Sequence, residues 1–209
     1  MSQLTTICSG DLTATVDSMG AQLMSLTCAG AEYLWQGDPK FWPRRAPVLF
    51  PIVGCLKNDE AMSAAGPVHL KRHGLARTNE HEVKEVAADS VTYELRSSEA
   101  TRELYPYDFC LNMAYSVDGT SLTQSFAVTN TGDVDLPFTL GGHPAFNVPL
   151  CEGERFEDYE LRFAKPWTAS SATMVEGGLW DFSHRVLVLN NASRLPLSHH
   201  LFDVDTLLL

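Results

Sequence analysis

The stretch CLNMAYSVDGTSLTQSFAVT, residues 110–129, decides the fold class. Apolar and polar residues alternate on both sides of Asp118-Gly119, and this pair is favoured in the tight turns of β-hairpins. A repeat of two residues is typical of a β-strand. We therefore expect two antiparallel strands joined by a turn at residues 118–120.

The same repeat recurs through most of the chain. Further segments alternate or are rich in β-branched and aromatic residues: LTATVD (12–17), QLMSLTC (22–28), HEVKEVA (81–87), VTYELRS (91–97) and YELRFA (159–164). Helical periodicity is scarce, because only DPKFWPRR and SSEATRELYPYD could each hold a turn or two. The pattern predicts an all-β fold, an antiparallel β-sandwich, rather than a doubly wound sheet.

Length, charge and cysteine content narrow the class of protein. With 209 residues and 44% hydrophobic content, we expect a single domain over residues 1–209. No signal-peptide pattern and no run near the ~20 apolar residues of a membrane span are present, and the five cysteines include no CxxC pair. We predict a soluble, cytoplasmic protein with reduced thiols and no membrane partner. The net charge of −11, with scattered basic residues, argues against a nucleic-acid partner.

Several other kinds of site find little support. His69 and His73 are four residues apart, but no HExxH pattern accompanies them, and no phosphate-binding loop or dinucleotide fingerprint is present. The acidic stretch CEGERFEDYE (151–160) could supply paired carboxylates, but a solvated face is the better interpretation. We expect neither a metal site nor a nucleotide cofactor.

Two histidine motifs remain, HGLAR (73–77) and TLGGHPAFNVP (139–149). Pro144 favours extended backbone at His143, and the preceding glycine pair permits close approaches, so the imidazole is held in one direction. Such a histidine either completes a turn or transfers a proton near neutral pH. Trp35, Trp42 and Phe146 are flat apolar surfaces suited to sugar rings, or else core residues.

In order along the chain, these motifs resemble the aldose 1-epimerase (galactose mutarotase) family, especially its bacterial LacX-like branch. The other matching segments are FWPRRAPVLFPIVG (41–54), FEDYELRF (156–163) and LFDVDTLLL (201–209). The resemblance implies a β-sandwich of the galactose mutarotase type, a small-molecule sugar as substrate and no cofactor. It also implies interconversion of α and β anomers, in which a base deprotonates the anomeric hydroxyl while an acid protonates the ring oxygen.

The resemblance further implies roles for individual residues. His143 matches the general acid, and His73 matches a histidine that hydrogen-bonds the substrate near the reacting oxygen. Arg77 and Asp205 match positions that contact sugar hydroxyls. Two further candidates for substrate binding are Asn147 of the second motif and Arg45, although Arg45, like Arg44, could instead face solvent or meet an anionic sugar such as a hexose phosphate.

Two departures from the family pattern have consequences. Many relatives carry a sugar-binding arginine after FPIVG, where this chain has Cys55, so that contact is either absent or supplied by Arg44, Arg45 or Arg77. The family's general base is a glutamate on a later strand than the segment matching LFDVDTLLL. We expect that segment to be part of a strand, the domain to be incomplete at its C-terminus, and the activity to be weak, because losing a positioned acid–base group costs about 10²–10⁴ in rate.

Two alternatives stay open. The same sandwich and aromatic residues would serve a non-catalytic carbohydrate-binding module, in which His143 only donates a hydrogen bond. The three final leucines could also pair with a second copy of the chain, which predicts a dimer.

Overall fold

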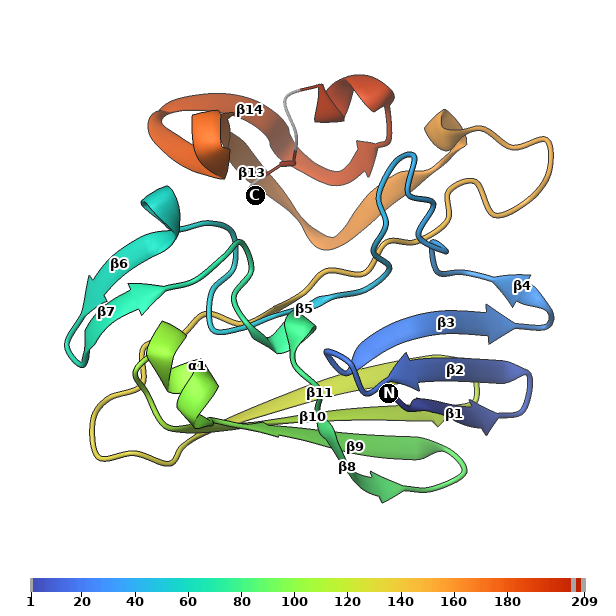
Figure 1. The fold of residues 1–209 in the computed structure, drawn as a ribbon. Coiled ribbons are helices and arrows are strands. Elements are labelled where there is room, and N and C mark those ends of the chain that lie inside the picture. Colours follow the sequence, from blue (N-terminus) through green and yellow to red (C-terminus); the bar gives the residue numbers. More distant parts are fainter. Residues whose placement is uncertain (1, 204–205, 208–209) are drawn as a thin grey trace. The chain divides into compact units, whose positions relative to one another are not determined.

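A computed structural model describes residues 2–203 and 206–207 (Figure 1). The chain divides into two compact units, Met1–Asn147 and Val148–Leu209. Each unit has its own hydrophobic cluster. The two units are therefore described separately.

The first unit contains two four-stranded antiparallel sheets (Figure 1). One sheet has the order β1-β2-β3-β4, formed by Leu4–Ser9, Leu12–Asp17, Gln22–Cys28 and Ala31–Glu32. The other has the order β11-β10-β9-β8, formed by Ser121–Asn130, Phe109–Asp118, Ser90–Arg96 and Glu82–Val86. Residues of both sheets, such as Ile7, Val16, Tyr93 and Met113, belong to one buried cluster. The predicted antiparallel β-sandwich is thus confirmed.

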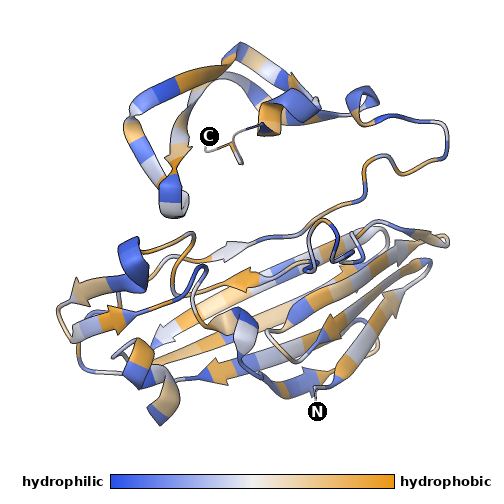
Figure 2. Ribbon diagram, turned by 45° about the horizontal axis from the view of Figure 1, so that its top comes forward, coloured by the Kyte–Doolittle hydropathy of each residue, from blue (hydrophilic) through white to orange (hydrophobic). Residues whose placement is uncertain are grey.

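The predicted hairpin at residues 110–129 is β10 and β11. Asp118 pairs with Ser121 across the turn, and Gly119 has a φ of 56°, the left-handed conformation that a tight turn requires. Along β10, alternate residues from Phe109 to Val117 are buried in the core. Figure 2 shows the corresponding alternation of hydrophobic and hydrophilic positions along the strands of this unit.

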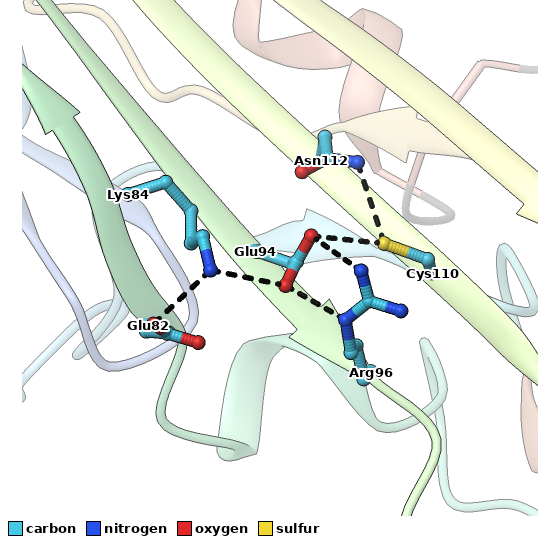
Figure 3. Close-up of polar contacts among 6 residues, drawn as sticks. All are labelled: Glu82, Lys84, Glu94, Arg96, Cys110 and Asn112. Atoms are coloured by element: carbon cyan, nitrogen blue, oxygen red, sulfur yellow. Dashed lines mark hydrogen bonds and ion pairs between the residues drawn. The ribbon is translucent and has the colours of Figure 1, made fainter.

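The outer face of the second sheet carries a polar network (Figure 3). The carboxylate of Glu94 accepts hydrogen bonds from Arg96 and from the thiol of Cys110, and it lies 3.6 Å from the ammonium of Lys84. Arg96 and Lys84 are therefore compensated by a carboxylate that is itself only 9% exposed.

Shorter elements connect the sheets. They are β5 (Val48–Leu49), β6 (Glu60–Ser63), β7 (Gly66–His69), β12 (Gly141–Gly142), the helix α1 (Glu99–Leu104) and the 3-10 turns η1 (Lys57–Asp59) and η2 (Ala76–Thr78). The helix lies within SSEATRELYPYD and begins with a reciprocal capping pair between Ser98 and Thr101. The other segment that could hold helix, DPKFWPRR, forms turns and bends only.

The second unit is built on one long hairpin. Strands β13 (Glu160–Val175) and β14 (Leu179–Pro196) pair antiparallel with several register shifts, and the 3-10 turns η3 (Phe156–Asp158), η4 (Glu176–Gly178) and η5 (His199–Phe202) lie outside the ladder. We expected residues 201–209 to be part of a strand, and this prediction is wrong for the first residues of the segment, which the structure describes. Leu201 and Phe202 belong to η5, because local hydrogen bonds to Ser198 and His200 close a turn there.

No helix among the described residues is long and apolar enough to cross a membrane.

Candidate functional site

The backbone before His143 is held by the short pairing of β12 with β5. Gly141 pairs with Leu49 and Gly142 with Val48, and the amide of His143 donates to the carbonyl of Pro47 at 3.0 Å. The segment FWPRRAPVLFPIVG therefore runs directly beside TLGGHPAFN, although about 90 residues separate the two in the sequence.

The HGLAR motif is anchored on the other end of the same segment. The carbonyl of Phe50 accepts the amides of Leu75 and Ala76, at 2.9 and 3.1 Å. Gly74 has a φ of 71°, and a Cβ placed there would lie 2.4 Å from the Phe50 oxygen, so only glycine fits. This close approach fixes the position of the preceding residue, His73.

His73 makes a reciprocal pair of hydrogen bonds with Gly54. Its amide donates to the Gly54 carbonyl at 2.8 Å, and the Gly54 amide donates to its Nδ1 at 3.0 Å. Since Nδ1 accepts a hydrogen bond, the proton of the neutral ring is on Nε2. His73 also has a φ of 69°, an uncommon conformation for a residue with a side chain.

These anchors bring the two motifs together. The rings of His73 and His143 meet edge to face with centroids 5.6 Å apart, and Trp42 stacks on His143 at 5.0 Å. Trp42 is held in turn by Trp35, whose indole nitrogen donates to the Trp42 carbonyl at 2.8 Å. His143 is exposed, whereas His73 is partly buried.

The two imidazoles have different environments. Partial burial, with the neighbouring charges of His143, Arg77 and Arg72, lowers the pKa of His73 to about 4. His73 is therefore neutral at pH 7 and offers Nε2–H as a hydrogen-bond donor. An imidazole pair of which one member stays neutral is suited to hydrogen bonding by one ring and proton transfer by the other.

Arginines surround His73. Arg77 donates from Nη2 to the carbonyl of Arg72 at 2.8 Å, and Arg72 donates from Nε to the sulfur of Cys55 at 3.1 Å. Burial, followed by the charges of Arg44 and Arg72, lowers the pKa of Arg77. The guanidinium beside Cys55 is thus that of Arg72, which sequence reasoning missed. Its place immediately before His73 in KRHGLAR was the available signal.

The remaining predicted binding residues have backbone partners. Arg45 donates from Nη1 to the Met24 carbonyl at 2.5 Å and to the Gln36 side chain at 2.6 Å. Asn147 donates to the carbonyls of Glu32 and Leu34. Asp205 lies outside the described residues. Roles for Arg45 and Asn147 in sugar binding stay predictions, as do the roles of the two histidines.

A cavity of about 510 Å³ lies beside Arg77, and its other lining residues include Asp59, Glu60, His69 and Lys71. Neither His73 nor His143 is among the described residues that line it. Lys71 is already paired with Asp59 at 2.8 Å. We therefore do not assign this cavity to the histidine pair. The described residues also contain no group of three His, Cys, Asp or Glu side chains placed to hold a metal ion.

Comparison with known proteins places the chain in one family. Residues 3–204 match the family model for aldose 1-epimerase. The chain is 38% identical over 206 residues to the plasmid-encoded protein LacX of Lactococcus lactis subsp. lactis, covering 95% of this chain and 69% of that relative.

Two solved structures are also similar to this chain in both sequence and fold. A galactose mutarotase related enzyme from Lactobacillus acidophilus superposes with a TM-score of 0.90 at 34% identity, covering 97% of this chain and 68% of that one. A galactose mutarotase-like protein from Lactobacillus casei ATCC 334 has a TM-score of 0.83 at 30% identity, with 97% and 70% covered. The match to the family model and these similarities show that the chain belongs to the aldose 1-epimerase family.

Proposed function

We propose that the chain interconverts the α and β anomers of an aldohexose or a related sugar by opening and reclosing the sugar ring. The observation that carries the proposal is the edge-to-face pair of His73 and His143, with Trp42 stacked on the second ring. Membership of the aldose 1-epimerase family supports it.

The reaction requires only proton transfers from the protein, and the sugar itself opens and closes its ring. A base removes the proton of the anomeric hydroxyl while His143 gives a proton to the ring oxygen, and the C1–O5 bond breaks. The resulting aldehyde rotates about the C1–C2 bond. The same steps in reverse close the ring on the other face, so neither oxidant nor cofactor takes part.

The two histidines have different roles in this proposal. His73 is neutral at pH 7 and donates a hydrogen bond from Nε2 to a sugar oxygen close to the reaction. Trp42 supplies an apolar face beside His143 on which the sugar ring rests. Their shared anchor, the segment 42–54, keeps this geometry in place before substrate arrives.

The base is a separate question. Among the described residues, no carboxylate forms an ion pair with His73 or His143; the histidines that do are His69, His184, His199 and His200. The family resemblance assigns the base to a late-strand glutamate.

Polarimetry with freshly dissolved α-glucose or α-galactose tests the proposal. We expect the 209-residue chain to speed anomer exchange above the buffer rate. The His143→Gln variant should lose about 10²-fold or more of the added rate, as expected when a positioned acid is removed. His69→Gln is the matched control, because His69 is an exposed histidine that lies 3.7 Å from the carboxylate of Glu60 and makes no ring contact with the described part of either histidine motif.

Two results would contradict this assignment. Exchange at the buffer rate, with sugar binding retained, would favour the carbohydrate-binding module. Equal rates for His143→Gln and His69→Gln would remove His143 from the mechanism.

A further inference from the structure

Among the described residues, Arg72 and Arg77 beside His73, and Arg44 beside Arg77, lack the carboxylate partners that five other arginines of this chain have. Arg96, Arg102, Arg155, Arg162 and Arg194 each form an ion pair with Asp or Glu. Among the described residues, none of the carboxylates pairs with Arg44, Arg72 or Arg77, although the chain has 26 acidic residues and only 15 Lys and Arg. In the cluster of Figure 3, by contrast, the carboxylate of Glu94 compensates the charges of Arg96 and Lys84.

Arg72 and Arg77 lie close enough to His73, and Arg44 close enough to Arg77, for their charges to act on one another. Arg72 directly precedes His73, and Arg77 is bonded to the Arg72 carbonyl. Arg44 is two residues from Trp42, the ring that stacks on His143. The Nε of Arg77 is buried and has no hydrogen-bond partner among the described residues. A buried donor left unpaired is costly, so a ligand oxygen at this place would be favourable.

Positive charge gathered without compensation is itself unfavourable, because like charges repel and part of this cluster is desolvated. Burial is the main cause of the lowered pKa of Arg77, and the charges of Arg44 and Arg72 add to it. Burial is also the main cause for His73, whose pKa is lowered further by the charges of His143, Arg77 and Arg72. A bound anion would reduce the repulsion among these positive charges. Guanidinium groups are also well suited to planar, two-point binding of phosphate and carboxylate.

We propose that the substrate is an anionic aldose, a sugar phosphate or sugar acid, whose charged group is bound by Arg72 and Arg77 with Arg44 beside them. This inference rests on the proposed anomer exchange and names its substrate class. The charged group cannot be on the anomeric oxygen, because that hydroxyl must lose its proton for the ring to open. The anionic group is therefore on another carbon of the sugar.

Calorimetric titration of the 209-residue chain tests the inference without depending on catalysis. The ligands are glucose, glucose 6-phosphate and glucuronate, the matching galactose series, and inorganic phosphate. We expect at least one anionic sugar to bind about 10- to 100-fold more tightly than its neutral parent, the range expected for a charge-assisted hydrogen bond. The phosphate and uronate arms distinguish the two sources of charge. Raising ionic strength should reduce the preference.

Variants locate the site. Arg72→Gln and Arg77→Gln should each reduce the preference for the anionic sugar by about 10-fold or more, because each loses a charge-assisted contact. Arg102→Gln is the control, since it removes the same charge from an arginine that is paired with Asp108. Arg72 is exposed, so its variant remains informative if the partly buried Arg77 variant unfolds.

The outcomes separate this inference from the proposed function. Equal affinity for neutral and anionic sugars, unchanged preference in both variants, or binding of inorganic phosphate as tight as that of the sugar phosphate would each overturn the inference. Polarimetric exchange of neutral and anionic sugars with equal kcat/KM would also overturn it while leaving anomer exchange standing. Selective binding of the anionic sugar without exchange of any sugar would support anion recognition and contradict the proposed function.

Discussion

Replacing Gly74 with alanine tests whether the approach of the HGLAR backbone to Phe50 positions His73. Gly74 has a φ of 71°, and a Cβ there would lie 2.4 Å from the Phe50 oxygen, which also accepts the amides of Leu75 and Ala76. A side chain in the left-handed conformation costs about 1–2 kcal/mol, and forcing a methyl group into packed atoms costs about 1–3 kcal/mol. We expect Gly74→Ala to lower the free energy of unfolding by about 2–5 kcal/mol.

Gly119→Ala is the matched control. Gly119 has a φ of 56°, but a Cβ there would have nothing within 4 Å, so its variant bears only the conformational cost of about 1–2 kcal/mol. Urea unfolding followed by circular dichroism measures both variants. Polarimetry at a temperature where both are folded measures anomer exchange, and we expect it to fall for Gly74→Ala alone because His73 shifts with its neighbour.

Equal destabilisation by the two substitutions would show that the Gly74 contact with Phe50 is not restrictive. Full exchange activity in a destabilised Gly74→Ala protein would show that His73 does not depend on this contact for its position.

Two further predictions concern the same rings. The pKa of His73 is lowered from 6.5 to about 4, so between these pH values the unfolded chain binds more protons than the folded one. The free energy of unfolding should therefore decrease as pH falls from about 6.5 to 4. In urea titrations His73→Gln should make this pH dependence weaker, and an unchanged pH dependence would contradict the low pKa. Trp42→Ala should lower kcat/KM for anomer exchange about 2- to 10-fold, because it removes the ring stacked on His143. Trp42→Phe should retain most of this activity, and equal losses for both variants would argue against a role for the aromatic face.

Much of the fold could be predicted because its signals are local. Alternation along residues 110–117 and 122–129, with Asp118-Gly119 between them, specified an antiparallel hairpin that the structure confirms. Local signals were less decisive at two places. The segment DPKFWPRR forms turns without helix, and Leu201 and Phe202 form a 3-10 turn where a strand was expected.

The candidate site was predicted only in part. The motifs HGLAR and GGHPAFN pointed to His73 and His143 because glycine and proline beside a histidine restrict its backbone. Apart from its position immediately before His73, nothing in the sequence indicated that Arg72 would lie against Cys55, where Arg44, Arg45 or Arg77 had been considered. Nor did it indicate that the side chain of Asn147 would bond to the Glu32 and Leu34 carbonyls.

The sequence by itself indicated strands β2, β3 and β8 to β11, the antiparallel hairpin within residues 110–129 and the two histidines as candidates, since each depends on residues within a few positions of one another. It did not indicate β1, β14 or most of β13. Only the tertiary structure decided that Trp42 stacks on His143 and that the Gly54 amide holds the proton of neutral His73 on Nε2. It also decided that Arg72 and Arg77, which pair with none of the described carboxylates, lie near the His73 ring. These features arise where segments distant in the sequence pack together. Burial and neighbouring charge, which set the pKa of His73, exist only after that packing has formed.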